Sequence, residues 1–202
     1  MFQLLFNYEE IKYIRENEII AFDLDNTLIT TIFTNENVND KYSEVMYFYK
    51  KSTYDNRYSV LRPGIKELLE LLKKKEYKLA LITDASYKRA STILKQFGFC
   101  DVFDFVLSRE ILSEVVNVSK LNRRIKPYNY IGYKCLIDDY TETIEYNGEK
   151  CIPIKPFTAK YIDNKIMIFD KNGICLSEYF EEFDSEKEYI MKIYFDILKV
   201  LN

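Results

Sequence analysis

Short runs of apolar residues recur along the chain, and helix-like segments separate them. This alternation is typical of an α/β fold with a parallel sheet buried on both faces. The runs that we interpret as strands are Glu18–Phe22, Tyr77–Thr83, Phe103–Ser108, Tyr133–Asp138 and Cys151–Lys155. The sequence therefore predicts a Rossmann-like parallel sheet flanked by helices. A length of 202 residues fits one domain better than two.

Three segments have apolar residues at helical spacing, and we interpret them as helices: 65–75, 86–97 and about 186–201. Pro63 and Gly64 open the first of them. Gly98 follows the second, where a glycine is typical of a C-terminal cap.

Two parts of the chain fall outside the predicted sheet. Residues 31–58 are polar, rich in tyrosine and poor in periodicity, so we interpret them as an insertion or flap near the carboxyl end of the first strand. Long loops of this kind are usually functional or disordered. Residues 158–202 form a C-terminal extension that is expected to end in a helix. We therefore expect residues 1–202 to form a single domain with a short insertion and no large cap domain.

The composition excludes several kinds of chemistry. The chain has no histidine, which removes Ser-His-Asp and Cys-His catalysis and the usual zinc sites. A net charge of -3 gives no general attraction to nucleic acid or to an anionic membrane. No stretch reaches the roughly 18 apolar residues of a membrane helix, and the N-terminus lacks the features of a secretion signal. We expect a cytoplasmic protein without a membrane partner.

The central motif is DLDNTL at residues 23–28, directly after the first predicted strand. In an extended chain, alternation would send the side chains of Asp23 and Asp25 to the same side. Ligands of open α/β sheets bind at the carboxyl ends of the strands. Two carboxylates there repel each other unless a cation or a shared proton lies between them, and a hard divalent ion such as Mg²⁺ prefers oxygen ligands. A turn at a strand end also explains the motif when it is taken alone.

Further polar residues follow later strands. Thr83 ends one strand, where its hydroxyl and the following backbone N–H groups could hold phosphate oxygens. Asp138 and Asp139 end another, and Lys120 precedes that strand. Each of these residues has an ordinary structural explanation as a cap, a turn or a solvated charge. Their ordered combination with the first motif favours a phosphate and metal site.

These motifs resemble those of the haloacid dehalogenase (HAD) superfamily. The closest resemblance is to the phosphatases of the RNA polymerase II C-terminal domain, also called the NLI-interacting-factor-like family. The matching segments are DLDNTL at 23–28, LRPG at 61–64, LITDAS at 81–86, a lysine at 120 and LIDD at 136–139. The likeness covers roughly residues 18–157.

The resemblance implies a role for each matching residue. Asp23 would attack phosphorus and become phosphorylated, and Asp25 would act as the acid and base. Thr83, Asp84 and Lys120 would bind the phosphoryl group. The resemblance also implies a set of metal ligands and supporting residues. Mg²⁺ would be held by Asp23, the Asp25 carbonyl and Asp139, with Asp138 and Thr27 as supporting residues.

Two features depart from the family pattern or leave it ambiguous. Lys126 is an alternative to Lys120, although the spacing of Lys120 suits the family better. Asp84 adds an acid after Thr83 where the family often has a small residue. The basic segment KLNRRIK at 120–126 is either a solvated helix face or a rim that attracts a phosphorylated chain or a nucleic acid end.

The sequence therefore predicts a magnesium-dependent phosphomonoester hydrolase that acts through an aspartyl-phosphate. Without a large cap the site stays open, which favours a phosphoprotein substrate. A phosphorylated nucleic acid end or a small phosphorylated metabolite is also compatible with these motifs. A phosphotransferase would carry the same motifs, and a non-catalytic scaffold could keep the same fold.

Overall fold

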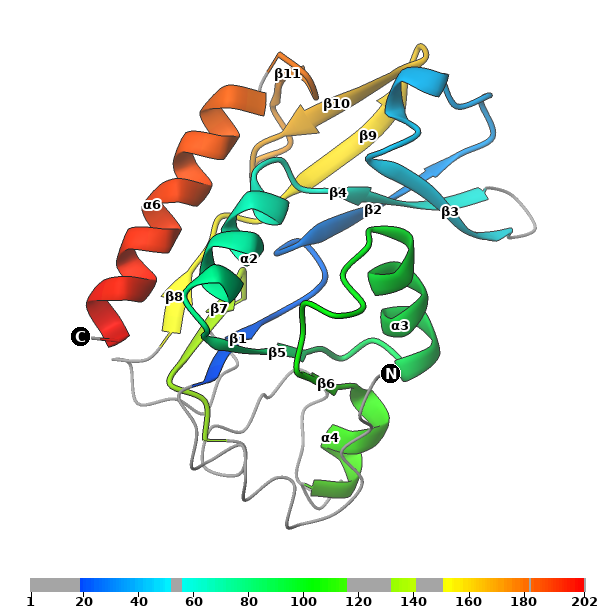
Figure 1. Ribbon diagram of the computed structural model, residues 1–202. Helices are drawn as coiled ribbons and strands as arrows, with labels where there is room; N and C mark the ends of the chain where they lie inside the picture. The colour runs from blue at the N-terminus through cyan, green and yellow to red at the C-terminus, as the bar shows by residue number, and fades with distance from the viewer. Residues whose placement is uncertain (1–18, 52–55, 116–131, 141–150, 182, 202) are drawn as a thin grey trace.

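The computed structural model describes residues 19–51, 56–115, 132–140, 151–181 and 183–201. Its centre is a five-stranded parallel sheet with the strand order β6-β5-β1-β7-β8 (Figure 1). The strands are β1 (Ile19–Phe22), β5 (Lys78–Ile82), β6 (Phe105–Leu107), β7 (Cys135–Asp138) and β8 (Cys151–Pro153). Each of them lies within a run that the sequence predicts as a strand. β1 lies at the middle of the sheet.

Helices cover both faces of this sheet. All four residues of β1 are buried, because apolar side chains from helices pack against each side. One face is covered by α2 (Ile65–Lys74), α3 (Tyr87–Gln96) and α6 (Phe183–Leu201). The opposite face is covered by α4 (Arg109–Val115). The predicted fold class, a parallel sheet flanked by helices, is confirmed.

The ends of the helices follow local sequence signals. The Ser86 side chain accepts a hydrogen bond from the backbone N–H of Arg89 at 3.3 Å and caps the N-terminus of α3. Gly98, just beyond α3, has a φ of +74°, as predicted for a C-terminal cap. Gly64, before α2, has a φ of +80°, and a Cβ there would lie 3.0 Å from the Cα of Lys187 in α6. Glycine at this position therefore allows α6 to lie close to the start of α2.

The predicted insertion is folded into a sheet of its own. β2 (Ile29–Thr34), β3 (Met46–Lys51) and β4 (Asn56–Leu61) form an antiparallel sheet with the order β2-β4-β3, and a short 3-10 helix, η1 (Asp40–Tyr42), precedes β3. The sequence analysis interpreted residues 31–58 as an insertion or flap without regular periodicity, and the structure forms strands there. Their apolar residues pack against the C-terminal extension, and a contact over this sequence distance cannot be read from the local pattern.

The C-terminal extension forms a second small antiparallel sheet. It consists of β9 (Thr158–Ile162), β10 (Lys165–Phe169) and β11 (Cys175–Glu178), and α6 follows as predicted. Residues of both small sheets share one apolar core. Its members are Ile32, Tyr42, Met46, Val60, Phe157, Ala159, Tyr161, Ile166, Ile168 and Tyr179. The insertion is thus stabilised by a segment that lies far away in sequence.

Each helix in the described ranges is too short or too polar to span a bilayer. The longest, α6, has 19 residues, and charged side chains interrupt its apolar positions.

A charged cluster at Glu178 ties the two small sheets together. The Glu178 carboxylate forms ion pairs with Lys41 and, at 3.0 Å, with Lys165, and it accepts a hydrogen bond from the Tyr42 hydroxyl at 2.8 Å. Lys41 and Tyr42 belong to η1, whereas Lys165 and Glu178 belong to the C-terminal sheet. The bonds from Lys41, Lys165 and Tyr42 lower the pKa of Glu178 from 4.5 to about 2.

This low pKa predicts a pH-dependent contribution to stability. A carboxylate whose pKa is lowered by folding stabilises the native state above its unfolded pKa and loses that effect as the pH falls through its folded pKa. We expect Glu178→Gln to be less stable than the wild type at pH 7. The difference in the free energy of unfolding should shrink between pH 4.5 and about 2. Urea unfolding of the wild type and of Glu178→Gln, measured from about pH 7 to about pH 2, tests this prediction.

Glu70→Gln is the matched control, because Glu70 is an exposed residue of α2 outside this cluster. A difference between Glu178→Gln and the wild type that stays constant from about pH 7 to about pH 2 would contradict the role of the Glu178 carboxylate.

Candidate active site

The carboxyl ends of β1 and β7 bring two predicted site residues together. Phe22 lies opposite Ile137 in the register of these strands, so the next residues, Asp23 and Asp138, lie side by side. The backbone N–H of Asp23 donates to the Ile137 carbonyl at 2.9 Å, which extends the pairing by one step. Both aspartates are mostly buried, with exposed fractions of 7% and 3%.

Asp139 completes an acidic cluster at this edge of the sheet. Asp23, Asp138 and Asp139 each offer a carboxylate oxygen, and these oxygens all lie within 4.8 Å of one another. Three carboxylates at such distances repel each other unless protons or a cation neutralise them. A hard cation such as Mg²⁺ is bound by oxygen ligands of this kind. The residues present therefore fit a magnesium ion.

The cluster differs in part from the expected set of ligands. Asp23 and Asp139 belong to it, as the resemblance implies. Asp138 belongs to it as well, although we expected that residue to have a supporting role. The side chain of Asp25 is not a member, so only its backbone carbonyl remains as the ligand that the resemblance implies.

A tight turn after Asp25 holds the motif in place. Asn26 has a φ of +60°, a left-handed conformation that asparagine tolerates better than most residues. The Thr27 side chain contacts Asp139, the residue that follows β7. Its hydroxyl donates to the Asp139 carboxylate at 3.3 Å and accepts from the Asp139 backbone N–H at 3.1 Å. Thr27 therefore fixes the turn relative to the acidic cluster.

Asp25 binds an arginine that the sequence analysis missed. Both terminal nitrogens of Arg89, in the first turn of α3, donate to the two Asp25 carboxylate oxygens, each at 2.5 Å. Arg89 also donates to the Thr31 hydroxyl at 3.1 Å. Burial lowers the pKa of Arg89, but its bonds to Asp25 outweigh that effect and raise the pKa above its ordinary value. The guanidinium thus stays charged and holds the Asp25 side chain by two parallel hydrogen bonds.

Thr83 lies on the other side of Asp23. β5 pairs with β1 so that Leu81 is opposite Phe22, which places Thr83 at the same sheet edge as Asp23. Thr83 is buried, and its backbone N–H donates to the Leu107 carbonyl at 3.0 Å. Its hydroxyl oxygen accepts from the Ala85 N–H at 3.0 Å, so its proton remains able to donate to a phosphate oxygen.

Asp84 directs its side chain to α4. Its carboxylate accepts a hydrogen bond from Arg109 Nε at 3.1 Å, and its carbonyl accepts one from the same nitrogen at 2.7 Å. A negatively charged side chain held in this way does not attract a phosphate. Only the backbone N–H of Asp84 is suited to the phosphate-binding position that the sequence suggests.

Lys120 and its alternative Lys126 lie outside the described residues, as does the whole basic segment 120–126. Their predicted roles stay predictions.

Arg62 binds the backbone of the first motif. The sequence analysis did not identify it as a site residue. Its side chain is 1% exposed. It donates to the carbonyls of Asn26 at 3.5 Å, Thr27 at 3.4 Å and Lys155 at 2.8 Å. Its Nε donates to the Glu186 carboxylate of α6 at 2.6 Å. In the sequence, only its position in the LRPG segment at 61–64 could have indicated a role at the site.

The acidic cluster predicts that magnesium stabilises the folded chain. A ligand that binds only the native state stabilises it by about 2.7 kcal/mol at about one hundred times its Kd. We expect added MgCl₂ to raise the thermal unfolding midpoint of the wild type at constant ionic strength. Asp138→Asn and Asp139→Asn should lose most of this rise.

Asp84→Asn is the control, because Asp84 lies at the same sheet edge but pairs with Arg109 and is outside the cluster. An equal rise in the wild type and in each of these variants would show that magnesium does not bind at the cluster.

Comparisons with known proteins relate this chain to a family of phosphatases. The sequence profile of the family described as NLI interacting factor-like phosphatase matches residues 18–191. A structure of the fission yeast RNA polymerase II CTD phosphatase Fcp1 bound to beryllium fluoride is similar to 73% of this chain, with 19% identity and a TM-score of 0.51. A structure of Fcp1 described as an essential RNA polymerase II CTD phosphatase is similar to 92% of it, with 17% identity and a TM-score of 0.54.

The chain spans about half the length of these two proteins, since the similar regions cover 44% and 52% of them. At these identities the likeness shows a shared fold. A search of the curated proteins gives no significant match. The family profile nevertheless extends over most of the sequence and includes the segments that carry Asp23, Thr83 and Asp139. This chain therefore belongs to the NLI interacting factor-like phosphatase family, within the HAD superfamily.

Proposed function

We propose that this protein is a magnesium-dependent phosphomonoester hydrolase that passes the phosphoryl group through Asp23 to water. The observation that carries the proposal is the close approach of the Asp23, Asp138 and Asp139 carboxylates at the edge of a parallel sheet. Membership of a phosphatase family supports it.

Asp23, Asp139 and the Asp25 carbonyl would hold Mg²⁺, and Asp138 lies close enough to take part. The ion would supply positive charge that screens the attacking carboxylate from the phosphate and stabilises charge on the phosphoryl oxygens.

Asp23 is the nucleophile of the first step. One of its carboxylate oxygens forms a bond to phosphorus while the bond from phosphorus to the ester oxygen breaks. The leaving oxygen takes a proton from Asp25. Splitting the hydrolysis into two transfers makes each displacement easier. β1 and the hydrogen bond to Ile137 hold the Asp23 backbone in place, which lowers the cost of orientation.

Asp25 is the base of the second step. A water molecule attacks phosphorus, Asp25 takes its proton, and the bond between phosphorus and the Asp23 oxygen breaks. The two bonds from Arg89 orient the Asp25 carboxylate for this step. Before the first step one of these bonds must break so that Asp25 can carry the proton for the leaving group.

Other groups would bind the phosphoryl oxygens. The Thr83 hydroxyl can donate a hydrogen bond because its oxygen already accepts one from Ala85. The backbone N–H of Asp84 is the second donor in this proposal, and Lys120 supplies the cation that the family resemblance implies. Together these groups stabilise charge as it develops in the transition state.

A phosphoprotein is the substrate that we favour. The Asp25 side chain is 43% exposed, so the acid and base lie within reach of a large molecule. The two similar structures are described as phosphatases of the RNA polymerase II CTD, which is a protein. A phosphorylated nucleic acid end remains the second candidate, since the basic segment 120–126 could attract it.

Hydrolysis of p-nitrophenyl phosphate tests the proposed activity. We expect turnover that depends on Mg²⁺ and falls to background in Asp23→Asn, because the nucleophile is lost. Asp25→Asn should lower kcat by about 10²–10⁴-fold, the usual contribution of a general acid or base.

Asp101→Asn is the control, because Asp101 is exposed and far in sequence from these motifs. Folded protein that gives no turnover with any divalent cation would contradict the hydrolase and favour a non-catalytic scaffold. Hydrolysis that survives Asp23→Asn would contradict the assigned nucleophile.

The pair of Arg89 and Asp25 makes a second prediction. Arg89→Met removes both bonds that orient the Asp25 carboxylate, so we expect kcat for p-nitrophenyl phosphate to fall about 10–100-fold. Arg89→Lys should lose less, because one cationic bond can form again. Lys88→Met, on the exposed side of the same helix, serves as the control. An unchanged kcat in Arg89→Met would show that Asp25 does not need this arginine.

A further inference from the structure

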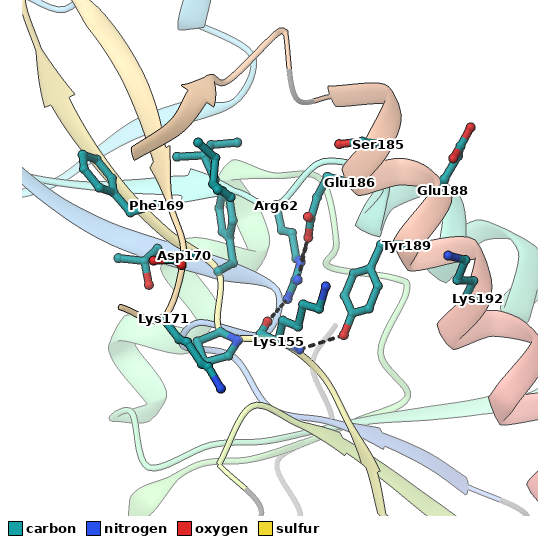
Figure 2. Close-up of a pocket in the computed structure, with 15 residues that line it drawn as sticks. Arg62, Lys155, Phe169, Asp170, Lys171, Ser185, Glu186, Glu188, Tyr189 and Lys192 are labelled. Atoms are coloured by element: carbon teal, nitrogen blue, oxygen red, sulfur yellow. Dashed lines mark hydrogen bonds and ion pairs between the residues drawn. The ribbon is translucent and has the colours of Figure 1, made fainter. Parts of the chain in front are cut away.

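Two arginines hold the first motif, and different parts of the chain hold each of them. Arg62 binds carbonyls of the motif, and it is itself bound by Glu186 of α6 and the Lys155 carbonyl (Figure 2). Arg89 binds the Asp25 side chain. Its further contacts come from the insertion, whose strand β3 lies beside α3 (Figure 1).

The insertion makes two contacts with the Arg89 guanidinium. The Thr31 hydroxyl of β2 accepts a hydrogen bond from it at 3.1 Å. The central carbon of the guanidinium lies over the Tyr49 ring of β3, at 5.7 Å from the ring centre. A cation within about 6 Å of an aromatic ring is attracted to the face of that ring. Asp25, Thr31 and Tyr49 therefore hold the guanidinium from three sides.

A β-bulge in β3 sets the direction of the Tyr49 side chain. The register between β3 and β4 shifts between Phe48 and Lys50, so Tyr49 is the extra residue of the bulge. A bulged residue leaves the regular ladder, and its side chain is aimed differently from those of its neighbours. The irregularity in this strand thus falls at the residue that contacts Arg89.

The other end of α3 is also attached to the insertion. The side-chain nitrogen of Gln96, the last residue of α3, donates to the Phe48 carbonyl at 2.8 Å. The ring of Phe97, the next residue, packs edge-to-face against the Tyr47 ring, with the ring centres 5.0 Å apart. Because both ends of α3 contact β3, the helix that carries Arg89 is fixed relative to the insertion.

These contacts connect the insertion to the proposed acid and base. An arginine side chain has many rotamers, and its guanidinium keeps one orientation only where contacts hold it. We propose that Thr31 and Tyr49 are positioning residues, which hold Arg89 in the orientation that binds both oxygens of the Asp25 carboxylate. The role of Asp25 as acid and base is that of the proposed function, on which this proposal rests.

A double-mutant cycle in the hydrolysis of p-nitrophenyl phosphate with Mg²⁺ tests the proposal. We expect Tyr49→Leu and Thr31→Val each to lower kcat about threefold to tenfold and to change KM less than about twofold, because Asp25 loses its orientation. In an Arg89→Met background the same changes should alter kcat less than about twofold, because the residue through which they act is gone. Tyr49→Phe and Thr31→Ser should keep most of kcat, since they retain the ring and the hydroxyl.

Phe48→Leu is the matched control. It removes the ring next to Tyr49 in β3, and that ring packs against Tyr58 with the ring centres 5.6 Å apart. We expect Phe48→Leu to leave kcat nearly unchanged in both backgrounds. Equal losses from Tyr49→Leu in the wild type and in Arg89→Met would overturn the proposal, because Tyr49 would then act independently of Arg89. A rise in KM without a fall in kcat would also overturn it, because it would indicate direct contact with the substrate.

Urea unfolding of the same variants distinguishes a failure of this proposal from a failure of the proposed function. We expect Tyr49→Leu to raise the unfolding equilibrium constant about threefold more in the wild type than in Arg89→Met, because the contact with the guanidinium exists without substrate. Additive effects on unfolding would overturn the proposal even in a protein without turnover. Coupled unfolding in a protein without turnover would contradict the proposed function and support the hold of Tyr49 on Arg89.

Discussion

The buried guanidinium of Arg62 joins three parts of the chain that would otherwise be independent. It binds two carbonyls of the first motif, the carbonyl of Lys155 after β8, and the carboxylate of Glu186 in α6. A charge that is 1% exposed costs several kcal/mol unless it is paired and fully hydrogen-bonded. A buried Arg62 needs all of these partners, so it links the turn at Asn26 and Thr27 to the C-terminal helix.

A second constraint is the repulsion between carboxylates at the edge of the central sheet. The structure separates the acids into two environments. Asp23 lies in the cluster that suits a divalent cation, whereas the side chain of Asp25 is neutralised by Arg89. These two environments match the different roles that we propose for the two aspartates, nucleophile for Asp23 and acid and base for Asp25. The turn at Asn26 and its anchor Thr27 preserve this separation.

The sequence predicted the parts of the structure that depend on local pattern. The five strands of the central sheet, the cap at Gly98 and the placement of Asp23, Thr83 and Asp138 at strand ends all follow from neighbouring residues. Long-range pairings could not be predicted in this way. Arg89 is 64 positions from Asp25, and Arg62 is 124 positions from Glu186. The sheet of the insertion was missed for the same reason, because its apolar face is covered by the C-terminal extension.

The most direct test of this account is chemical trapping of the phosphorylated enzyme. Protein mixed with p-nitrophenyl phosphate and Mg²⁺ is quenched in acid, treated with borohydride and digested, and the peptides are analysed by mass spectrometry. Borohydride reduces an acyl phosphate to an alcohol, so the account predicts that Asp23 is converted to homoserine only when substrate and Mg²⁺ are both present. Conversion at another carboxylate, or turnover without any conversion, would contradict Asp23 as the nucleophile.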